Sequence, residues 1–291
     1  MRSKLFVPGS RPELFAKALA GDADAISFDV EDSVPEDAKV RAREQIADFL
    51  RSSTSRESLR NKIIIVRVNA VTSRHFEGDL IAFACPQVAL LNLPKAQNVA
   101  DIQMAAATLD RVERDIGLDR PMRLLVNIET PRAVRQACEL ADAHPRVAGL
   151  QLGLTDLFES LRIDRQDMHS VHAGMFAVRL ASGESGRFTY DSAFPDVADE
   201  GGFRREAELA RRMGYIGKSC VHPKQVAIAN EIFRVDELQL ESARRIVAAA
   251  REAAAAGRGA FLLDGRMIDL PIIKRAEALL AAANEAAPLS R

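Results

Sequence analysis

Two carboxylates stand directly after two of the apolar runs in this chain of 291 residues. Glu129 follows the run 124–128, Asp156 lies just beyond the run 147–152, and a helical pattern joins the two. Strand, helix and strand over roughly thirty residues form one βαβ unit, whose parallel strands end at the same edge of a sheet. Two carboxylates at that edge are the oxygen ligands that a hard cation such as Mg²⁺ prefers. The alternative is that each acid only caps the helix that follows it.

The same placement of polar residues recurs along the chain. The runs that read as strands are 4–7, 25–29, 63–69, 88–93, 124–129, 147–153, 187–190 and 217–221. Further polar residues at or just after the ends of these runs are Glu31, Asp32, Arg67, Asn69, Lys95 and His222. Eight strands that alternate with helices predict an α/β fold, a (β/α)8 TIM barrel, whose active site lies at the carboxyl ends of the strands. An open doubly wound sheet is the alternative, but segment 7–10 lacks its glycine-rich first turn.

Arg67 interrupts the most β-branched of these runs, residues 63–69. Such a run is typical of a strand that is buried on both faces of a parallel sheet. An arginine there needs an anionic partner, which is either a protein carboxylate or a ligand. The pattern alone leaves both partners open.

Composition excludes several classes of function. Forty Lys and Arg residues balance 41 Asp and Glu residues, so the chain has no basic footprint for nucleic acid or an anionic membrane. The chain has an odd number of cysteines, and they are far apart: Cys85, Cys138 and Cys220. This pattern favours a protein of a reducing compartment that has neither a disulfide framework nor a structural zinc site. No apolar run is long enough for a membrane span or a signal peptide. We therefore expect a soluble cytoplasmic protein.

The chain is expected to divide after the eighth strand. Residues 1–223 would form the barrel, and residues 224–291 a C-terminal helical extension that packs on the barrel or on a neighbouring subunit. Patterns in the extension predict helices over 225–233, 238–256 and 269–283, with a short strand over 260–263. Asp269 would be the N-cap of the last helix, because Pro271 follows in its first turn.

Eight short motifs in a fixed order cover nearly the whole chain. They are Arg2-Ser3-x-Leu5-Phe6-Val7-Pro8-Gly9, Asp29-x-Glu31-Asp32-Ser33-Val34, Arg67-Val68-Asn69, Leu93-Pro94-Lys95, Ile128-Glu129-Thr130-Pro131, Gly153-Leu154-Thr155-Asp156, Gly217-Lys218 with Val221-His222-Pro223, and Asp264-Gly265-x-Met267-Ile268-Asp269. Together they resemble the citrate lyase β-subunit family, part of the malyl-CoA and citramalyl-CoA lyase group of the HpcH/HpaI aldolase superfamily. Segment 185–203 matches this family poorly, which leaves the substrate preference open.

The resemblance implies a TIM barrel, usually a homotrimer, that binds Mg²⁺ and acyl-CoA thioesters. By position, Glu129 and Asp156 match the metal ligands, and Arg67 matches the arginine that binds the substrate carboxylate. Asp269 matches an acid that the adjacent subunit delivers, and Asp32 belongs to the acidic strand end that supports the site. The expected catalytic residues are Arg67, Glu129, Asp156, Asp269 and Asp32, of which Arg67 and Glu129 also bind substrate.

These residues suit the reversible cleavage of a 3-hydroxyacyl-CoA to acetyl-CoA and a 2-oxo acid. The substrate would be of the citramalyl-CoA, malyl-CoA or citryl-CoA type. A cation held by Glu129 and Asp156 would act as Lewis acid and template. Acids near Asp32 and Asp269 are candidates for the proton transfers, in an order that the sequence does not assign. The residues expected to contact coenzyme A are Arg2, Phe6, Pro8, Lys39 and Arg43, whose basic members are alternatively solvated surface side chains.

Other functions could use the same site. A malate or methylmalate synthase, or a malyl-CoA thioesterase, would combine this site with hydrolysis. A lyase β subunit would act on the thioester of an acyl-carrier protein. A scaffold on a decayed barrel is disfavoured, because all the charges at the strand ends are present. His169 and His172 are interpreted as an exposed helix face rather than a metal site, and His222 as a structural residue at the end of the barrel.

Overall fold

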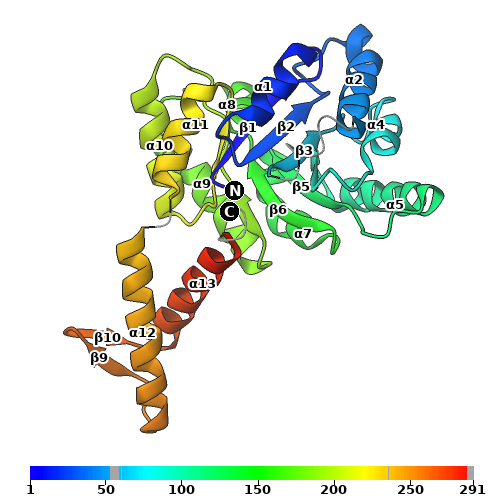
Figure 1. Ribbon diagram of the computed structural model, residues 1–291. Coiled ribbons are helices and arrows are strands. Elements are labelled where there is room, and N and C mark those ends of the chain that lie inside the picture. The colour runs from blue at the N-terminus through cyan, green and yellow to red at the C-terminus, as the bar shows by residue number, and fades with distance from the viewer. Residues whose placement is uncertain (53–58, 60, 235, 287–291) are drawn as a thin grey trace. The chain divides into compact units, whose positions relative to one another are not determined.

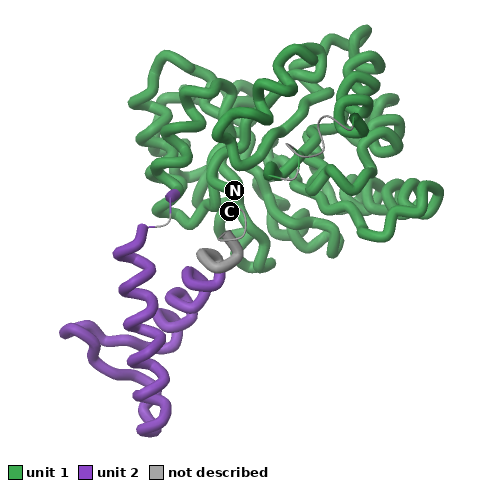
Figure 2. Tube along the Cα trace, viewed as in Figure 1, with its two compact units in different colours: residues 1–233 green, residues 234–291 purple. Residues whose placement is uncertain are grey.

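The computed structural model describes the chain except for residues 53–58, 60, 235 and 287–291 (Figure 1). The chain divides into two compact units, residues 1–233 and 234–291 (Figure 2). The division falls later than the boundary expected after residue 223, because helix α11 (Pro223–Ile232) packs on the first strand. Ser3 Oγ donates a hydrogen bond of 2.7 Å to Asn230 Oδ1 of this helix.

Within the described residues, eight parallel strands form the sheet of the first unit. They are β1 (Ser3–Pro8), β2 (Ala25–Asp29), β3 (Ile63–Arg67), β4 (Leu90–Leu93), β5 (Arg123–Ile128), β6 (Val147–Leu152), β7 (Phe188–Tyr190) and β8 (Lys218–Cys220). Their hydrogen-bonded order is β7-β6-β5-β4-β3-β2-β1-β8. Asp191, just after β7, closes the ring: its N–H donates to the Gly217 carbonyl at 3.0 Å, and its carbonyl accepts from Ser219 at 3.2 Å. The expected (β/α)8 barrel is confirmed.

Helices surround this barrel (Figure 1). They are α1 (Phe15–Ala20), α2 (Lys39–Arg51), α4 (Phe76–Phe83), α5 (Val99–Ile116), α6 (Pro131–Arg135), α7 (Ala137–Asp142), α8 (Leu154–Leu161), α9 (Met168–Glu184), α10 (Glu200–Arg212) and α11, with 3₁₀ turns at Pro12–Leu14 and Glu36–Ala38. Outward side chains of the strands pack on them, as where Phe28 of β2 meets Phe15 and Phe49 with ring centroids 5.0 and 5.9 Å away. No helix in the described part of the chain is long and apolar enough to cross a membrane.

The side chains inside the barrel change in character along the strands. Near the amino ends they form a small apolar cluster of Ala25, Ile65, Leu90, Leu125 and Ala148. Further along the strands they become polar, although they stay buried: Ser27, Asn92, Asn127 and Gln151. Buried polar groups are costly unless they are hydrogen-bonded. The polar part of the barrel interior thus lies toward the carboxyl ends of the strands, where the sequence predicts the site.

A network of buried ion pairs joins β7 and β8 to helix α10. Lys218 Nζ lies 2.7 Å from Asp191 Oδ2 and 2.5 Å from Glu206 Oε1. Arg165 binds the second oxygen of Glu206 at 2.7 Å. Burial alone would raise the pKa of Glu206, but Lys218 and Arg165 outweigh this effect and lower it to about 2. Each buried charge in this network has an opposite charge beside it.

The second unit consists of α12 (Glu237–Ala255), the antiparallel strands β9 (Phe261–Leu263) and β10 (Arg266–Ile268), and α13 (Leu270–Ala286). The short strand expected over 260–263 is confirmed, but its partner strand was not expected, so the extension is not purely helical. Asp264 and Gly265 connect the two strands with φ angles of 50° and 78°. An Asp-Gly pair favours such a turn, because both central residues need positive φ.

We expect Lys218→Met to lower the free energy of unfolding by about 3–5 kcal/mol, because it leaves the buried Asp191 without its cation and leaves Glu206 with Arg165 alone among the described cations. Lys4→Met is the matched control. Lys4 is equally buried on the neighbouring strand, but its Nζ contacts the Gln151 amide oxygen and the ring of Phe6, and no carboxylate of a described residue lies within ion-pair distance. Its loss should cost little. Urea unfolding followed by circular dichroism measures both variants, and equal losses would contradict this account.

Candidate active site

Arg67, the last residue of β3, pairs in register with Asp29, the last residue of β2. Its Nε and Nη2 donate to the two oxygens of Asp29 at 2.8 and 2.6 Å, and its Nη1 lies 3.0 Å from Glu31 Oε2. Burial would raise the pKa of Asp29, but the charge of Arg67 outweighs this effect and lowers it. The protein partner considered for Arg67 is therefore present. Since a guanidinium has five N–H groups, two remain for a ligand.

Lys95 connects three of the strand ends. It follows β4 with a φ of 53°, in the left-handed region that residues other than glycine rarely adopt. Its N–H donates to Glu129 Oε1 at 2.5 Å, and its Nζ lies 2.5 Å from Glu31 Oε1 and 2.7 Å from Asp32 Oδ1. Strained backbone of this kind concentrates at functional sites. The catalytic residues predicted from the sequence omit Lys95, although its position after a strand was a usable signal.

Glu129 is a deeply buried carboxylate at this edge. No cation of a described residue forms an ion pair with it. Its side chain is 3% exposed. Among the described residues, the hydrogen-bond donors to its two oxygens are the N–H of Lys95 and Asn127 Nδ2, the latter at 3.1 Å. Burial, and after it the charge of Asp156, raise the pKa of Glu129 to about 7. Gly153 makes room for this side chain, because a Cβ atom at that position would lie 2.6 Å from the Cβ of Glu129.

Neither predicted metal ligand serves as a helix cap. The N-cap of α6 is Thr130, whose side chain accepts from the N–H of Ala133 at 3.1 Å. The N-cap of α8 is Gly153, and Asp156 lies within the first turn of that helix. Asp156 is exposed and forms no hydrogen bond or ion pair with a described residue. The capping alternative therefore explains neither Glu129 nor Asp156.

The donor set of this edge fits Mg²⁺. Glu129 and Asp156 offer carboxylate oxygens, the first buried without an ion pair to any described residue and the second open to solvent. The described residues contain no group of three or more metal-ligating side chains, so His169 and His172 do not join such a cluster. Mg²⁺ needs none, because it commonly takes one or two carboxylates and keeps its other positions for water or substrate.

Two of the residues expected to contact coenzyme A are held by carboxylates instead. Arg2 precedes β1, so it lies at the amino edge of the barrel, where its Nη2 is 2.7 Å from Asp24 Oδ1. Contact with coenzyme A was expected of Arg2, but strand polarity puts a residue before β1 at the edge opposite the candidate site. Arg43 donates from Nε to the buried Asp79 at 2.7 Å.

The other three expected coenzyme A contacts lie near Arg67 or just after β2. The ring centroid of Phe6 is 5.2 Å from the guanidinium carbon of Arg67. Pro8 is the register partner of Asp29. Lys39 donates to two backbone carbonyls just after β2, at 3.1 and 2.7 Å. Phe6 and Pro8 therefore stay candidates for contact with a ligand at this edge, while the amine of Lys39 is occupied by the backbone.

The two acids considered for proton transfer belong to different units. Asp32 follows β2 and is half exposed beside the amine of Lys95. Asp269 precedes α13, and its carbonyl accepts from the N–H of Ile273 at 3.0 Å. Its side chain forms no capping hydrogen bond with a described residue, so the carboxylate is free for another role. The predicted residues that the first unit brings to one edge are Arg67, Glu129, Asp156, Asp32, Phe6 and Pro8.

Residues 2–223 match the family described as HpcH/HpaI aldolase/citrate lyase. The chain belongs to this family. The resemblance predicted from the motifs is therefore confirmed, and the family match covers the whole barrel of the first unit.

Curated relatives and solved structures of the HpcH/HpaI aldolase/citrate lyase family match nearly the full chain. An L-malyl-CoA/beta-methylmalyl-CoA lyase from Cereibacter sphaeroides is 32% identical over 96% of this chain and 93% of its own. A (3S)-malyl-CoA thioesterase from the same species is 35% identical over 97% and 94%. Protein CitE from Mycobacterium tuberculosis, solved with magnesium, acetoacetate and coenzyme A, is similar with a TM-score of 0.74 and 30% identity over 98% of this chain and 100% of that chain.

In metal-free protein, the ionisation of Glu129 should destabilise the fold. Its pKa of about 7 lies above the ordinary value of 4.5, so the penalty is absent below about pH 4.5 and fully present above about pH 7. Glu129→Gln removes it. We therefore expect the variant to melt at a higher temperature than the wild type at pH 8 in EDTA, with a difference that shrinks toward pH 5.

Calorimetry in the presence of EDTA measures this difference. Asp156→Asn is the control, because the exposed Asp156 loses little solvation on folding and should change the melting temperature less. A Glu129→Gln effect that is independent of pH would show that burial does not strain this carboxylate.

Proposed function

We propose that this protein is a Mg²⁺-dependent acyl-CoA lyase, which cleaves a carbon–carbon bond of a 3-hydroxyacyl-CoA to give acetyl-CoA and a 2-oxo acid. One observation carries the proposal: Glu129 is buried beside Asp156 without an ion pair to any described residue, at the edge where two N–H groups of Arg67 contact no described residue. The lyase relative and the CitE complex with magnesium and coenzyme A support it.

Each residue at the edge has a role in this reaction. Bound by Glu129 and Asp156, Mg²⁺ would supply Lewis-acid stabilisation of substrate oxygens. Arg67 would bind the carboxylate of the substrate with its remaining N–H groups, in the forked geometry that suits two oxygens. The N–H of Lys95 and the amide of Asn127 hold the Glu129 carboxylate in place.

Two protons must move while the carbon–carbon bond breaks. The bond lies between the thioester α-carbon and the carbinol carbon. The hydroxyl group on the carbinol carbon loses a proton as that carbon becomes a carbonyl, and the α-carbon gains one as the acetyl thioester forms. A positioned acid or base is typically worth about 10²–10⁴ in rate. Asp32 and Asp269 are the candidates for these transfers.

Thioester hydrolysis at the same site is the second candidate function. The (3S)-malyl-CoA thioesterase is 35% identical to this chain, slightly more than the lyase relative. Both reactions start from a similar bound thioester and differ in the bond that breaks. A subunit that acts on an acyl-carrier protein, and a cytoplasmic location, stay predictions, the latter in keeping with three free cysteines.

Product analysis separates these reactions. We expect purified protein with Mg²⁺ to convert malyl-CoA to acetyl-CoA and glyoxylate, or citramalyl-CoA to acetyl-CoA and pyruvate, as read by mass spectrometry. A thioesterase would give free coenzyme A and the intact hydroxy acid.

EDTA should stop turnover and Mg²⁺ should restore it, while Glu129→Gln and Asp156→Asn should stay folded and lose activity. Full activity in excess chelator would contradict the proposed Mg²⁺-dependent reaction.

We also propose that the protein is a homotrimer in which Asp269 completes the active site of an adjacent subunit. Asp269 stands at the start of α13 with a half-buried carboxylate that forms no capping hydrogen bond with a described residue. Closed symmetric assemblies are the usual state of soluble oligomers. Asp269→Asn should leave stability almost unchanged, since the side chain forms no capping bond, and should slow turnover by about 10²–10⁴.

Mixed oligomers test whether the site is shared. Asp269→Asn subunits keep Glu129, and Glu129→Gln subunits keep Asp269. After exchange at equal amounts, about one quarter of the sites in random symmetric assemblies would contain both intact residues from different chains. A mixture of Glu129→Gln and Asp156→Asn subunits is the matched control, because both residues belong to the same barrel and should not complement. Equal recovery in both mixtures, or none after demonstrated exchange, would rule out sharing through Asp269.

A further inference from the structure

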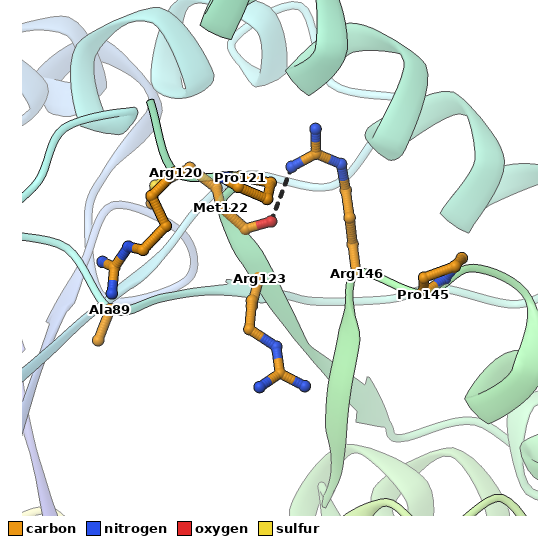
Figure 3. A pocket seen from close by; sticks show the side chains of 7 residues that line it. All are labelled: Ala89, Arg120, Pro121, Met122, Arg123, Pro145 and Arg146. Carbon is orange, nitrogen blue, oxygen red and sulfur yellow. Dashed lines mark hydrogen bonds between the residues drawn. The ribbon is translucent and has the colours of Figure 1, made fainter. Parts of the chain in front are cut away.

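A cavity lies at the amino edge of the barrel, at the opposite end of the strands from the candidate active site. It has a volume of about 290 Å³, and its lining residues are Ala89, Arg120, Pro121, Met122, Arg123, Pro145 and Arg146 (Figure 3). These residues stand at the starts of β4, β5 and β6. Arg123 begins β5 and Glu129 follows its end, so about 20 Å of extended chain separates them. The cavity is therefore distinct from the proposed metal site.

Arg146 is already neutralised by carboxylates. Its Nη1 donates to Glu113 Oε1 at 2.7 Å and to the Met122 carbonyl at 2.8 Å, and its Nη2 lies 2.5 Å from Glu113 Oε2. Asp110 is a further partner. Figure 3 shows the Arg146 guanidinium directed toward Met122 and away from those of Arg120 and Arg123. Arg146 thus shapes the wall of the cavity and has little charge to offer a ligand.

Arg120 and Arg123 have donors to spare. Both side chains are exposed. Arg120 donates one long hydrogen bond, 3.4 Å, to the Val88 carbonyl. Arg123 forms no hydrogen bond or ion pair with a described residue. Among the described residues, no carboxylate lies within ion-pair distance of either guanidinium, so two positive charges face solvent at one cavity.

The rest of the wall is largely apolar. Ala89, Pro121, Met122 and Pro145 contribute most of it. Cavities near 300 Å³ with apolar walls and a few polar groups are typical sites for small molecules. A guanidinium binds the paired oxygens of a carboxylate or phosphate with a planar fork. We infer that this cavity binds a small organic anion, whose carboxylate or phosphate group contacts Arg120 and Arg123 and whose apolar part contacts the two prolines.

Titration calorimetry on the full chain tests this inference with two probes, benzoate and phenyl phosphate, which share a ring and differ in the anionic group. We expect at least one to bind, and the tighter one identifies the preferred anion. Arg120→Gln and Arg123→Gln should each weaken binding by about tenfold or more, since each removes a charged hydrogen bond. Arg212→Gln, on the exposed face of α10, is the control and should bind like the wild type.

Three results would overturn the inference. The first is that neither probe binds. The second is that binding is unaffected by both cavity variants, which would place the probes elsewhere, for example beside Arg67. The third is that inorganic phosphate and acetate, which lack the ring, bind as tightly as the probes, because the apolar wall would then contribute nothing. None of these measurements uses catalysis, so their outcome does not depend on the proposed lyase activity.

Discussion

The ion pair between Arg67 and Asp29 organises the carboxyl edge of the barrel. Parallel strands bring all their polar ends to this edge, and buried charges there need partners. Arg67 fixes Asp29 and Glu31, and the amine of Lys95 binds the other oxygen of Glu31. The N–H of Lys95 then reaches Glu129. A continuous set of contacts thus runs from β2 to β5. Glu129 lies at the β5 end of this set, where the described hydrogen-bond donors to its carboxylate are uncharged groups.

Two buried carboxylates of this barrel show what the difference in partners means. Glu206 is held by Lys218 and Arg165, its pKa is lowered to about 2, and its charge is satisfied within the protein. Glu129 is also buried, 3% exposed against 1% for Glu206, but it forms no ion pair with a described residue, and its pKa is raised to about 7. Burial therefore opposes the ionisation of Glu129. A buried group with such a perturbed pKa at the carboxyl edge of a barrel is a candidate for a functional site.

Strand polarity explains why so much of this site could be predicted from the sequence. A residue just after an apolar run of a parallel sheet must lie at the carboxyl edge, which placed Arg67, Glu129 and Asp156 together. The same rule should have excluded Arg2, which precedes its strand. Spacing could not predict the left-handed turn at Lys95 or the partnership of Lys218 with Glu206, because these depend on tertiary packing. The first unit extends beyond the predicted boundary for the same reason. The sequence pattern of α11 does not show that this helix packs on β1.

Metal binding without substrate tests most directly whether Glu129 and Asp156 hold a divalent cation. Mn²⁺ prefers the same oxygen ligands as Mg²⁺ and can be followed by electron paramagnetic resonance. At pH 8 we expect one site per chain in the wild type, and binding weaker by about tenfold or more in both Glu129→Gln and Asp156→Asn, since each removes a charged ligand. Wild-type affinity should also fall below pH 7, because Glu129 must lose its proton to bind. Equal affinity in all three proteins would contradict the claim.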